Sequence, residues 1–120
     1  MSAGVLIVDD DHWYAASMER ELVRASYDVR CVGDVVAALD AMDDIQPDAV
    51  VLDLLLPGAN GLALLHELRS HADWATVPVV VVTTLDSVSE DLLRPYGVVK
   101  LHRKQTMHPC DIVETIGAVA

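Results

Sequence analysis

Residues 78–83 read Pro-Val-Val-Val-Val-Thr, and the four consecutive valines decide the fold class. A strand with one face in water alternates apolar and polar residues, whereas a strand buried on both faces is apolar throughout. Residues 79–82 fit the second pattern, so we expect a strand over residues 77–82 in the interior of a sheet. Strands of this kind occur mainly in parallel sheets that have helices on both sides.

Four further β-branched runs predict the remaining strands, at residues 4–8, 28–32, 49–52 and 98–101. Helix-length amphipathic stretches separate the runs, with apolar residues at helical spacing. An alternation of strands and helices is typical of an α/β domain with a parallel sheet covered on both faces. We therefore expect five strand–helix units in one domain spanning residues 1–120.

Three predicted helices begin at residues that commonly cap helices: Asp34, Asn60 and Ser87. Pro95 and Gly97 should end the helix that follows Ser87 early, because proline and glycine both interrupt helices. Pro109 is expected in the first turn of the last helix, where its missing N–H has no partner to lose.

Composition excludes several classes of function. The chain has 120 residues, 52% of them apolar, with 19 acidic and 8 basic residues and a net charge of −11. This charge should repel nucleic acids and anionic membranes, so we expect neither as a partner. No run approaches the roughly 20 apolar residues of a membrane span, the two cysteines have no metal-ligand spacing, and the N-terminus lacks a signal-peptide pattern. We expect a cytoplasmic protein.

Polar side chains directly follow four of the predicted strands: Asp9, Asp10 and Asp11, then Asp53, Thr83 and Lys104. The carboxyl ends of parallel strands meet at one edge of the sheet, where such folds bind ligands. Crowded carboxylates repel one another unless a cation holds them ionised, and an all-oxygen set suits Mg²⁺. A metal, an ammonium and a hydroxyl are together suited to phosphoryl transfer. Trp13 and Tyr14 follow the aspartates and either line this site or pack with the first helix.

The chain resembles the receiver domains of two-component response regulators over essentially its whole length. The resemblance is carried by residues 5–11, Val-Leu-Ile-Val-Asp-Asp-Asp, by residues 47–61, Pro-Asp-Ala-Val-Val-Leu-Asp-Leu-Leu-Leu-Pro-Gly-Ala-Asn-Gly, and by residues 78–83. Gly97, followed seven positions later by Lys104, completes the set. The resemblance implies a flavodoxin-like, doubly wound α/β fold with a five-stranded parallel sheet in the order 2-1-3-4-5.

The resemblance also implies what the site residues do. Asp53 would accept a phosphoryl group from a histidine kinase or phosphotransfer protein, and Thr83 and Lys104 would contact the phosphoryl oxygens. Phosphorylation would then switch contacts with a downstream protein or a fused output domain through the face from the fourth to the fifth helix. The chain itself is expected to hold no output domain and to act as no enzyme beyond its own phosphorylation and slow dephosphorylation.

For the metal, the resemblance implies that Asp10 and Asp53 bind Mg²⁺ directly. The backbone carbonyl of Leu55 would be the third protein ligand, and Asp9 would act through a water molecule.

Two other functions compete with this interpretation. Leu101 stands where receivers usually have a tyrosine or phenylalanine, and Gln105 where a proline usually follows the lysine. With the shortened fourth helix, these departures suggest a receiver-like interaction module that acts independently of phosphorylation. The second alternative is a phosphatase with an aspartyl nucleophile, which needs an acid two residues beyond Asp53; Leu55 occupies that position.

Overall fold

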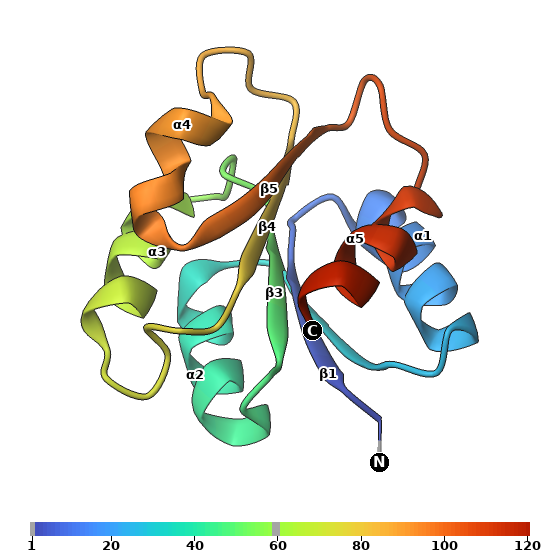
Figure 1. The fold of residues 1–120 in the computed structure, drawn as a ribbon, viewed down its shortest axis with the longest axis horizontal. Helices are drawn as coiled ribbons and strands as arrows, with labels where there is room; N and C mark the ends of the chain where they lie inside the picture. Colours follow the sequence, from blue (N-terminus) through green and yellow to red (C-terminus); the bar gives the residue numbers. More distant parts are fainter. Residues whose placement is uncertain (1, 59–60) are drawn as a thin grey trace.

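The computed structural model describes residues 2–58 and 61–120 and contains a five-stranded parallel sheet in the order β2-β1-β3-β4-β5. The predicted fold class is therefore confirmed. The strands are β1 (Gly4–Val8), β2 (Asp28–Val32), β3 (Ala49–Leu52), β4 (Val79–Thr83) and β5 (Val98–Arg103). In Figure 1 the sheet is seen between two layers of helices, with the loops that follow the strands at the top.

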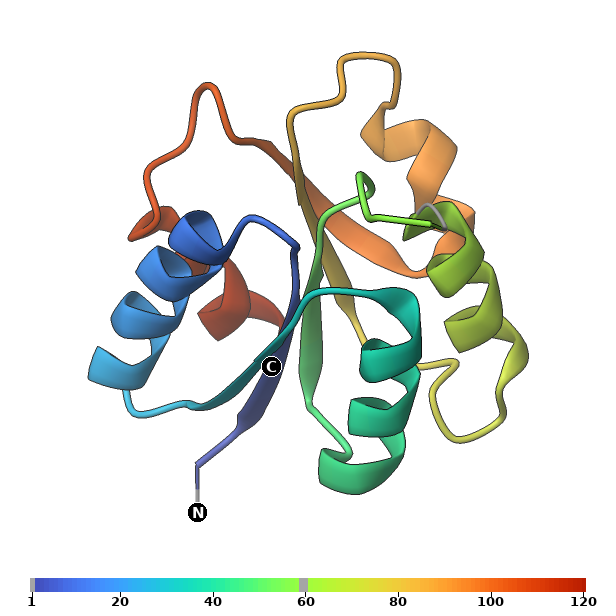
Figure 2. The same ribbon diagram turned by 180° about the vertical axis from the view of Figure 1, so that it is seen from behind.

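The helices divide between the two faces of the sheet. They are α1 (His12–Arg24), α2 (Val35–Ile45), α3 (Gly61–Ser70), α4 (Glu90–Leu93), the 3₁₀ turn η1 (Arg94–Tyr96) and α5 (Asp111–Val119). The helices α1 and α5 cover one face, and α2, α3 and α4 cover the other, as the view from behind also shows (Figure 2).

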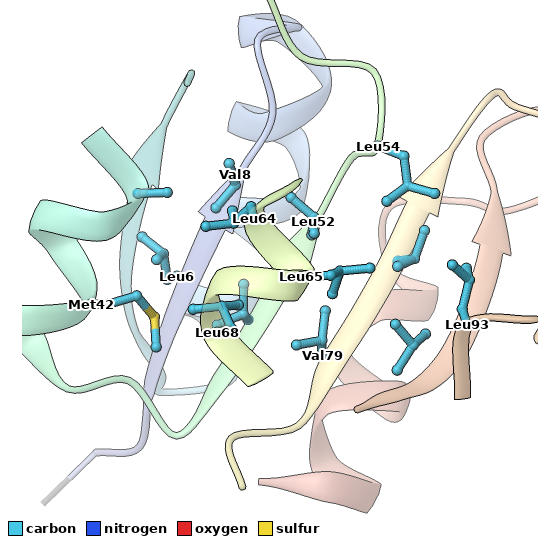
Figure 3. Close-up of a cluster of buried hydrophobic side chains, with 14 of the residues drawn as sticks. Leu6, Val8, Met42, Leu52, Leu54, Leu64, Leu65, Leu68, Val79 and Leu93 are labelled. Atoms are coloured by element: carbon cyan, nitrogen blue, oxygen red, sulfur yellow. The ribbon is translucent and has the colours of Figure 1, made fainter. Parts of the chain in front are cut away.

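Each interior strand supplies side chains to two separate cores, which explains why its sequence is apolar throughout. In β1, Leu6 and Val8 pack toward α2 and α3, whereas Val5 and Ile7 pack toward α1 and α5. Figure 3 shows the first of these cores, where three leucines of α3 lie against the strands of the sheet. The four valines of β4 are likewise fully buried, as their sequence predicts.

Three of the predicted strands match the structure residue for residue, and the other two need correction. β4 runs from Val79 to Thr83 rather than over residues 77–82, because the backbone N–H of Val77 donates to Trp74 in the preceding turn. β5 continues to Arg103 instead of ending at Leu101, because its pairing with β4 extends to the end of that strand.

Of the predicted helix starts, the one at Asp34 is confirmed, since Asp34 Oδ1 accepts a hydrogen bond of 2.8 Å from Ala37 N. The prediction that Asn60 caps α3 lies outside the described residues. Ser87 is wrong as the cap of α4: Ser89 holds that place, its hydroxyl accepting from Leu92 N at 3.2 Å. Pro109 lies two residues before the first residue of α5 rather than in its first turn.

The helix α4 ends early, as predicted. Pro95 lies in the 3₁₀ turn that follows α4, and Gly97 ends that turn with φ of +85°, a conformation that favours glycine. None of the helices in the described ranges is long and apolar enough to cross a membrane.

Gly61 at the start of α3 should tolerate no side chain. A Cβ there would lie 2.7 Å from Leu54 Cα and 2.8 Å from Asp53 O, so the backbone would have to move. We expect Gly61→Ala to lower the free energy of unfolding by about 1–3 kcal/mol in urea denaturation. In Gly117→Ala the new methyl group meets nothing closer than 3.7 Å and lies within α5, so this variant should be equally or more stable. Equal losses in both variants would contradict the close approach at Gly61.

Candidate functional site

Asp9 and Asp53 are fixed at the carboxyl edge of the sheet because each continues the hydrogen bonding of the strand before it. The backbone N–H of Asp9 donates to the carbonyl of Val32 at 3.0 Å, and that of Asp53 donates to the carbonyl of Val8 at 2.9 Å. In both side chains, Oδ1 accepts a hydrogen bond of 2.9 Å from the backbone N–H two residues further on. The residues are only 2% and 4% exposed, so the two carboxylates are buried side by side.

Lys104 supplies the positive charge of the site. Its backbone N–H donates to Thr83 O at 3.0 Å, which fixes the start of the loop after β5. Its ammonium nitrogen lies 2.8 Å from Asp9 Oδ2 and 2.9 Å from Asp53 Oδ2, and its side chain is 9% exposed. The structure thus brings together Asp9, Asp53 and Lys104, which are far apart in the sequence.

Burial and charge act in opposite directions on these groups. Burial raises the pKa of Asp9 above its usual value, and the Lys104 ammonium lowers it only in part. Burial would lower the pKa of Lys104, but the two carboxylates outweigh burial and raise it. At neutral pH the lysine is therefore charged, and it offsets the repulsion between its two acidic neighbours.

Asp10 adds an exposed carboxylate beside the buried pair. One oxygen each from Asp9, Asp10 and Asp53 lie within 4.8 Å of one another. The cluster offers only oxygen ligands, which hard divalent cations prefer. It is therefore able to hold a metal ion.

Thr83 ends β4 at the same edge and is fully buried. Its hydroxyl accepts a hydrogen bond of 3.3 Å from Leu85 N. The N–H of Leu55 donates to Asp53, and its side chain is exposed. It stays a prediction that the Leu55 carbonyl binds the metal and that the Thr83 hydroxyl contacts a phosphoryl oxygen.

The protein-family model of the response regulator receiver domain matches residues 5–96 of this chain. The chain belongs to that family. The predicted function class, a receiver of two-component signal transduction, is thereby confirmed. Receivers are response regulator modules rather than an enzyme family, so the phosphatase alternative is not favoured. Membership of this family does not favour the phosphorylation-independent module either.

Known proteins similar to this receiver agree in sequence and in fold. Response regulator MprA of Mycobacterium bovis is 42% identical over 90 residues, which are 75% of this chain and 38% of MprA. The chain thus spans less than half the length of this curated relative. The BeF3-activated N-terminal receiver domain of Klebsiella pneumoniae RstA is 26% identical with a TM-score of 0.84, covering 97% of both chains. Chemotaxis response regulator CheY4 of Vibrio cholerae has the same fold, with a TM-score of 0.88 at 22% identity over the full length of both chains.

Tyr14 of this receiver lines the site and also packs in the core, whereas Trp13 is 74% exposed. The Lys104 ammonium nitrogen lies 4.7 Å from the centroid of the Tyr14 ring. Burial raises the pKa of Tyr14, so the ring is neutral at physiological pH. The sequence left open whether Tyr14 lines the site or packs with the first helix. Tyr14 lies three residues after Asp11, the cap of α1, which places it on the helix but does not show which face of the helix is buried.

Gln105 does not prevent the lysine from reaching the carboxylates. The Gln105 side-chain amide donates to Thr84 O at 2.9 Å and links the loop after β5 to the loop after β4. This contact anchors the backbone next to Lys104.

Arg103 has a structural role that the sequence did not indicate. Its guanidinium donates to the carbonyl oxygens of Leu85 and Val88, the latter at 2.7 Å. One residue of β5 thereby holds the loop between β4 and α4. Glu90, the first residue of α4, in turn accepts a hydrogen bond of 3.1 Å from Leu101 N.

Removal of the Lys104 charge should destabilise the protein, because its two buried acidic partners would then lack a cation. Without divalent cations at pH 7, Lys104→Met is expected to lower the free energy of unfolding by about 3 kcal/mol, because a buried ion pair loses one partner. Urea denaturation measures this loss. Lys100→Met, which changes a half-exposed lysine, serves as the control and should have a small effect.

The loss caused by Lys104→Met should depend on pH. A carboxyl group whose pKa is raised on folding destabilises the protein as the pH rises above its unfolded value, which for Asp9 is 3.8. The deficit should therefore be largest at pH 7 and shrink as the pH falls toward 4. A deficit that does not change over this range would contradict the electrostatic explanation.

Proposed function

We propose that Asp53 is the phosphoacceptor of this receiver, and that a histidine kinase or a phosphotransfer protein is its donor. The observation that carries the proposal is the position of Asp53 Oδ2, 2.9 Å from a buried ammonium at the ligand-binding edge of the sheet. In the transfer, a carboxylate oxygen of Asp53 forms a bond to phosphorus as the bond between phosphorus and the donor's histidine nitrogen breaks. Lys104 offsets the negative charge that gathers on the phosphoryl oxygens, and the Thr83 hydroxyl donates to one of them.

We further propose Mg²⁺ as the resident metal. Asp10 and Asp53 would hold it directly, together with the Leu55 carbonyl, and Asp9 through a water molecule. Asp9 Oδ2 is buried and, apart from its ion pair with Lys104, accepts no hydrogen bond from residues within the described ranges. This oxygen therefore keeps a lone pair with which to accept a hydrogen bond from such a water. When bound, Mg²⁺ supplies positive charge next to the transferring phosphoryl group.

For the organisation of the protein, we propose that residues 1–120 act as one receiver domain in the cytoplasm. A downstream protein or a fused output domain would bind the face from α4 to α5. This face carries three exposed apolar side chains, Leu92, Tyr96 and Val99, which a partner could cover.

Phosphorylation by a small donor tests the assignment of Asp53. Incubation with acetyl phosphate and Mg²⁺ should add one phosphoryl group, because the receiver itself supplies the groups that act in the transfer. Asp53→Asn should abolish the gain in intact mass. Asp11→Asn is the matched control, since asparagine caps α1 as well as aspartate does, and it should still be modified. An unmodified parent protein would support the phosphorylation-independent module instead, and an equally modified Asp53→Asn variant would refute this phosphoacceptor.

Thermal melting tests the metal site. At a tenfold excess over its dissociation constant, Mg²⁺ should stabilise the protein by about 1.4 kcal/mol, which corresponds to roughly 3–6 °C in the melting temperature. Asp10→Asn should remove most of this shift without disturbing the core, because Asp10 is exposed. Asp40→Asn, in an exposed position of α2, should keep the full shift. A parent melting temperature that Mg²⁺ leaves unchanged would count against the site.

A further inference from the structure

Tyr14 contacts Lys104 of the site, yet the proposed chemistry gives it no role. It lies in the first turn of α1, is 8% exposed and packs in the core between α1 and α5. Its ring lies 4.7 Å from the Lys104 ammonium, within the range of a cation–π interaction. The ring of Trp13 packs edge-on against it, with 6.4 Å between centroids. Tyr14 is therefore held in place by its helix, the core and a neighbouring ring.

Within the described ranges, the Lys104 ammonium contacts Asp9 Oδ2 at 2.8 Å, Asp53 Oδ2 at 2.9 Å and the Tyr14 ring. The lysine side chain is only 9% exposed, so little water screens these contacts. A cation–π interaction is strongest when the cation is desolvated. The ring is thus a substantial part of the environment that fixes the ammonium.

We propose that Tyr14 is a positioning residue for Lys104, whose ring holds the ammonium against Asp53 and so sets the rate of phosphoryl transfer. This inference rests on the proposed role of Asp53. Tyr14 does not itself touch the phosphoryl group; it acts through the lysine.

A neutral ring is suited to this task for an electrostatic reason. A third carboxylate would also hold the ammonium, but it would add a negative charge to a site that must admit an anionic phosphoryl group. The face of an aromatic ring attracts a cation while carrying no net charge. Tyr14 therefore fixes Lys104 without repelling the incoming group.

Fixing the head of Lys104 matters because the lysine side chain is long and flexible. Its backbone is anchored by the hydrogen bond to Thr83 O, and the neighbouring Gln105 is anchored by Thr84 O. Neither contact restricts the rotatable bonds of the side chain, whose freedom opposes a single orientation. When Asp53 forms its bond to phosphorus, one of the two carboxylates that hold the ammonium changes, whereas Asp9 and the Tyr14 ring stay in place. Preorganisation of this kind lowers a barrier without any new contact to the reacting atoms.

The hydroxyl of Tyr14 should not be needed. It is buried and has no hydrogen-bond partner in the part of the chain that the structure describes. A buried hydroxyl without a partner is destabilising. Phenylalanine presents the same ring face, so Tyr14→Phe keeps the proposed function of the residue and removes only the hydroxyl.

The test compares Tyr14→Leu, Tyr14→Met and Tyr14→Phe with the parent protein. The rate of phosphorylation by acetyl phosphate is measured at saturating Mg²⁺, and Mg²⁺ affinity is measured separately by calorimetry. Loss of the ring should slow phosphorylation by roughly 3- to 30-fold, the range that corresponds to a desolvated cation–π contact. Mg²⁺ affinity should stay within about twofold, because Lys104 is not a metal ligand in the proposed site. Tyr14→Phe should phosphorylate at the parent rate and melt at the same or a higher temperature.

Met18→Leu is the matched control for repacking, since Met18 lies one helical turn further along α1 in the same core. It should phosphorylate at the parent rate. A second measurement needs no phosphorylation: the side-chain protons of Lys104 should show upfield ring-current shifts in the NMR spectra of the parent and Tyr14→Phe, and lose them in Tyr14→Leu.

Three results of the rate and affinity measurements would overturn the inference: a parent rate in Tyr14→Leu, a rate that Tyr14→Phe fails to preserve, or equal losses of rate and Mg²⁺ affinity. Absence of the ring-current shifts in the parent would also overturn it, even if the non-aromatic variants do not fold. A parent protein that gains no phosphoryl group refutes the role of Asp53 first, and this inference with it. The two failures are therefore distinguishable.

Discussion

One ammonium shared between two buried carboxylates is the interaction on which this site depends. Asp9 and Asp53 lie at the ends of neighbouring strands, and both would be costly to bury as anions without a cation between them. Lys104 arrives from the far edge strand and satisfies both, so it links the ends of β1, β3 and β5. The same geometry that stabilises the unphosphorylated protein places a positive charge where a phosphoryl group would arrive. In the proposed function, stability and reactivity therefore depend on the same three side chains.

The site is a continuation of the sheet rather than a separate structure. Asp9, Asp53 and Lys104 each donate a backbone hydrogen bond to the neighbouring strand, one residue beyond the end of their own strand. The parallel register of the strands consequently fixes the three Cα positions before any side chain contributes. This explains how apolar strands such as β1 and β3 still specify a polar site so closely.

Much of the fold and the gathering of the site residues could be predicted because both follow from local patterns. Apolar and β-branched runs predicted the strands, and the rule that parallel strands end at one edge predicted that the acids and the lysine lie together. What could not be predicted depends on contacts between distant segments. The contact of Tyr14 with Lys104 joins residues 90 positions apart. The hydrogen bonds from Arg103 to the loop before α4 depend on the register of β5. The choice of Ser89 over Ser87 as a cap depends on where that loop is held.

The loop between β4 and α4 shows how the site and the proposed output face are physically connected. The Thr83 hydroxyl accepts from Leu85 N, and the carbonyl of Leu85 accepts from Arg103 in β5. A hydroxyl that accepts one hydrogen bond still has its own hydrogen to donate, so Thr83 is able to bind a phosphoryl oxygen without first releasing the loop. Any displacement of Thr83 would then pull on Leu85 and, through it, on Arg103. Leu101, which stands where receivers usually have an aromatic residue, donates its backbone N–H to Glu90 at the start of α4, so β5 contacts both the loop after β4 and the first residue of α4. These hydrogen bonds give the proposed output face a contiguous physical connection to the site.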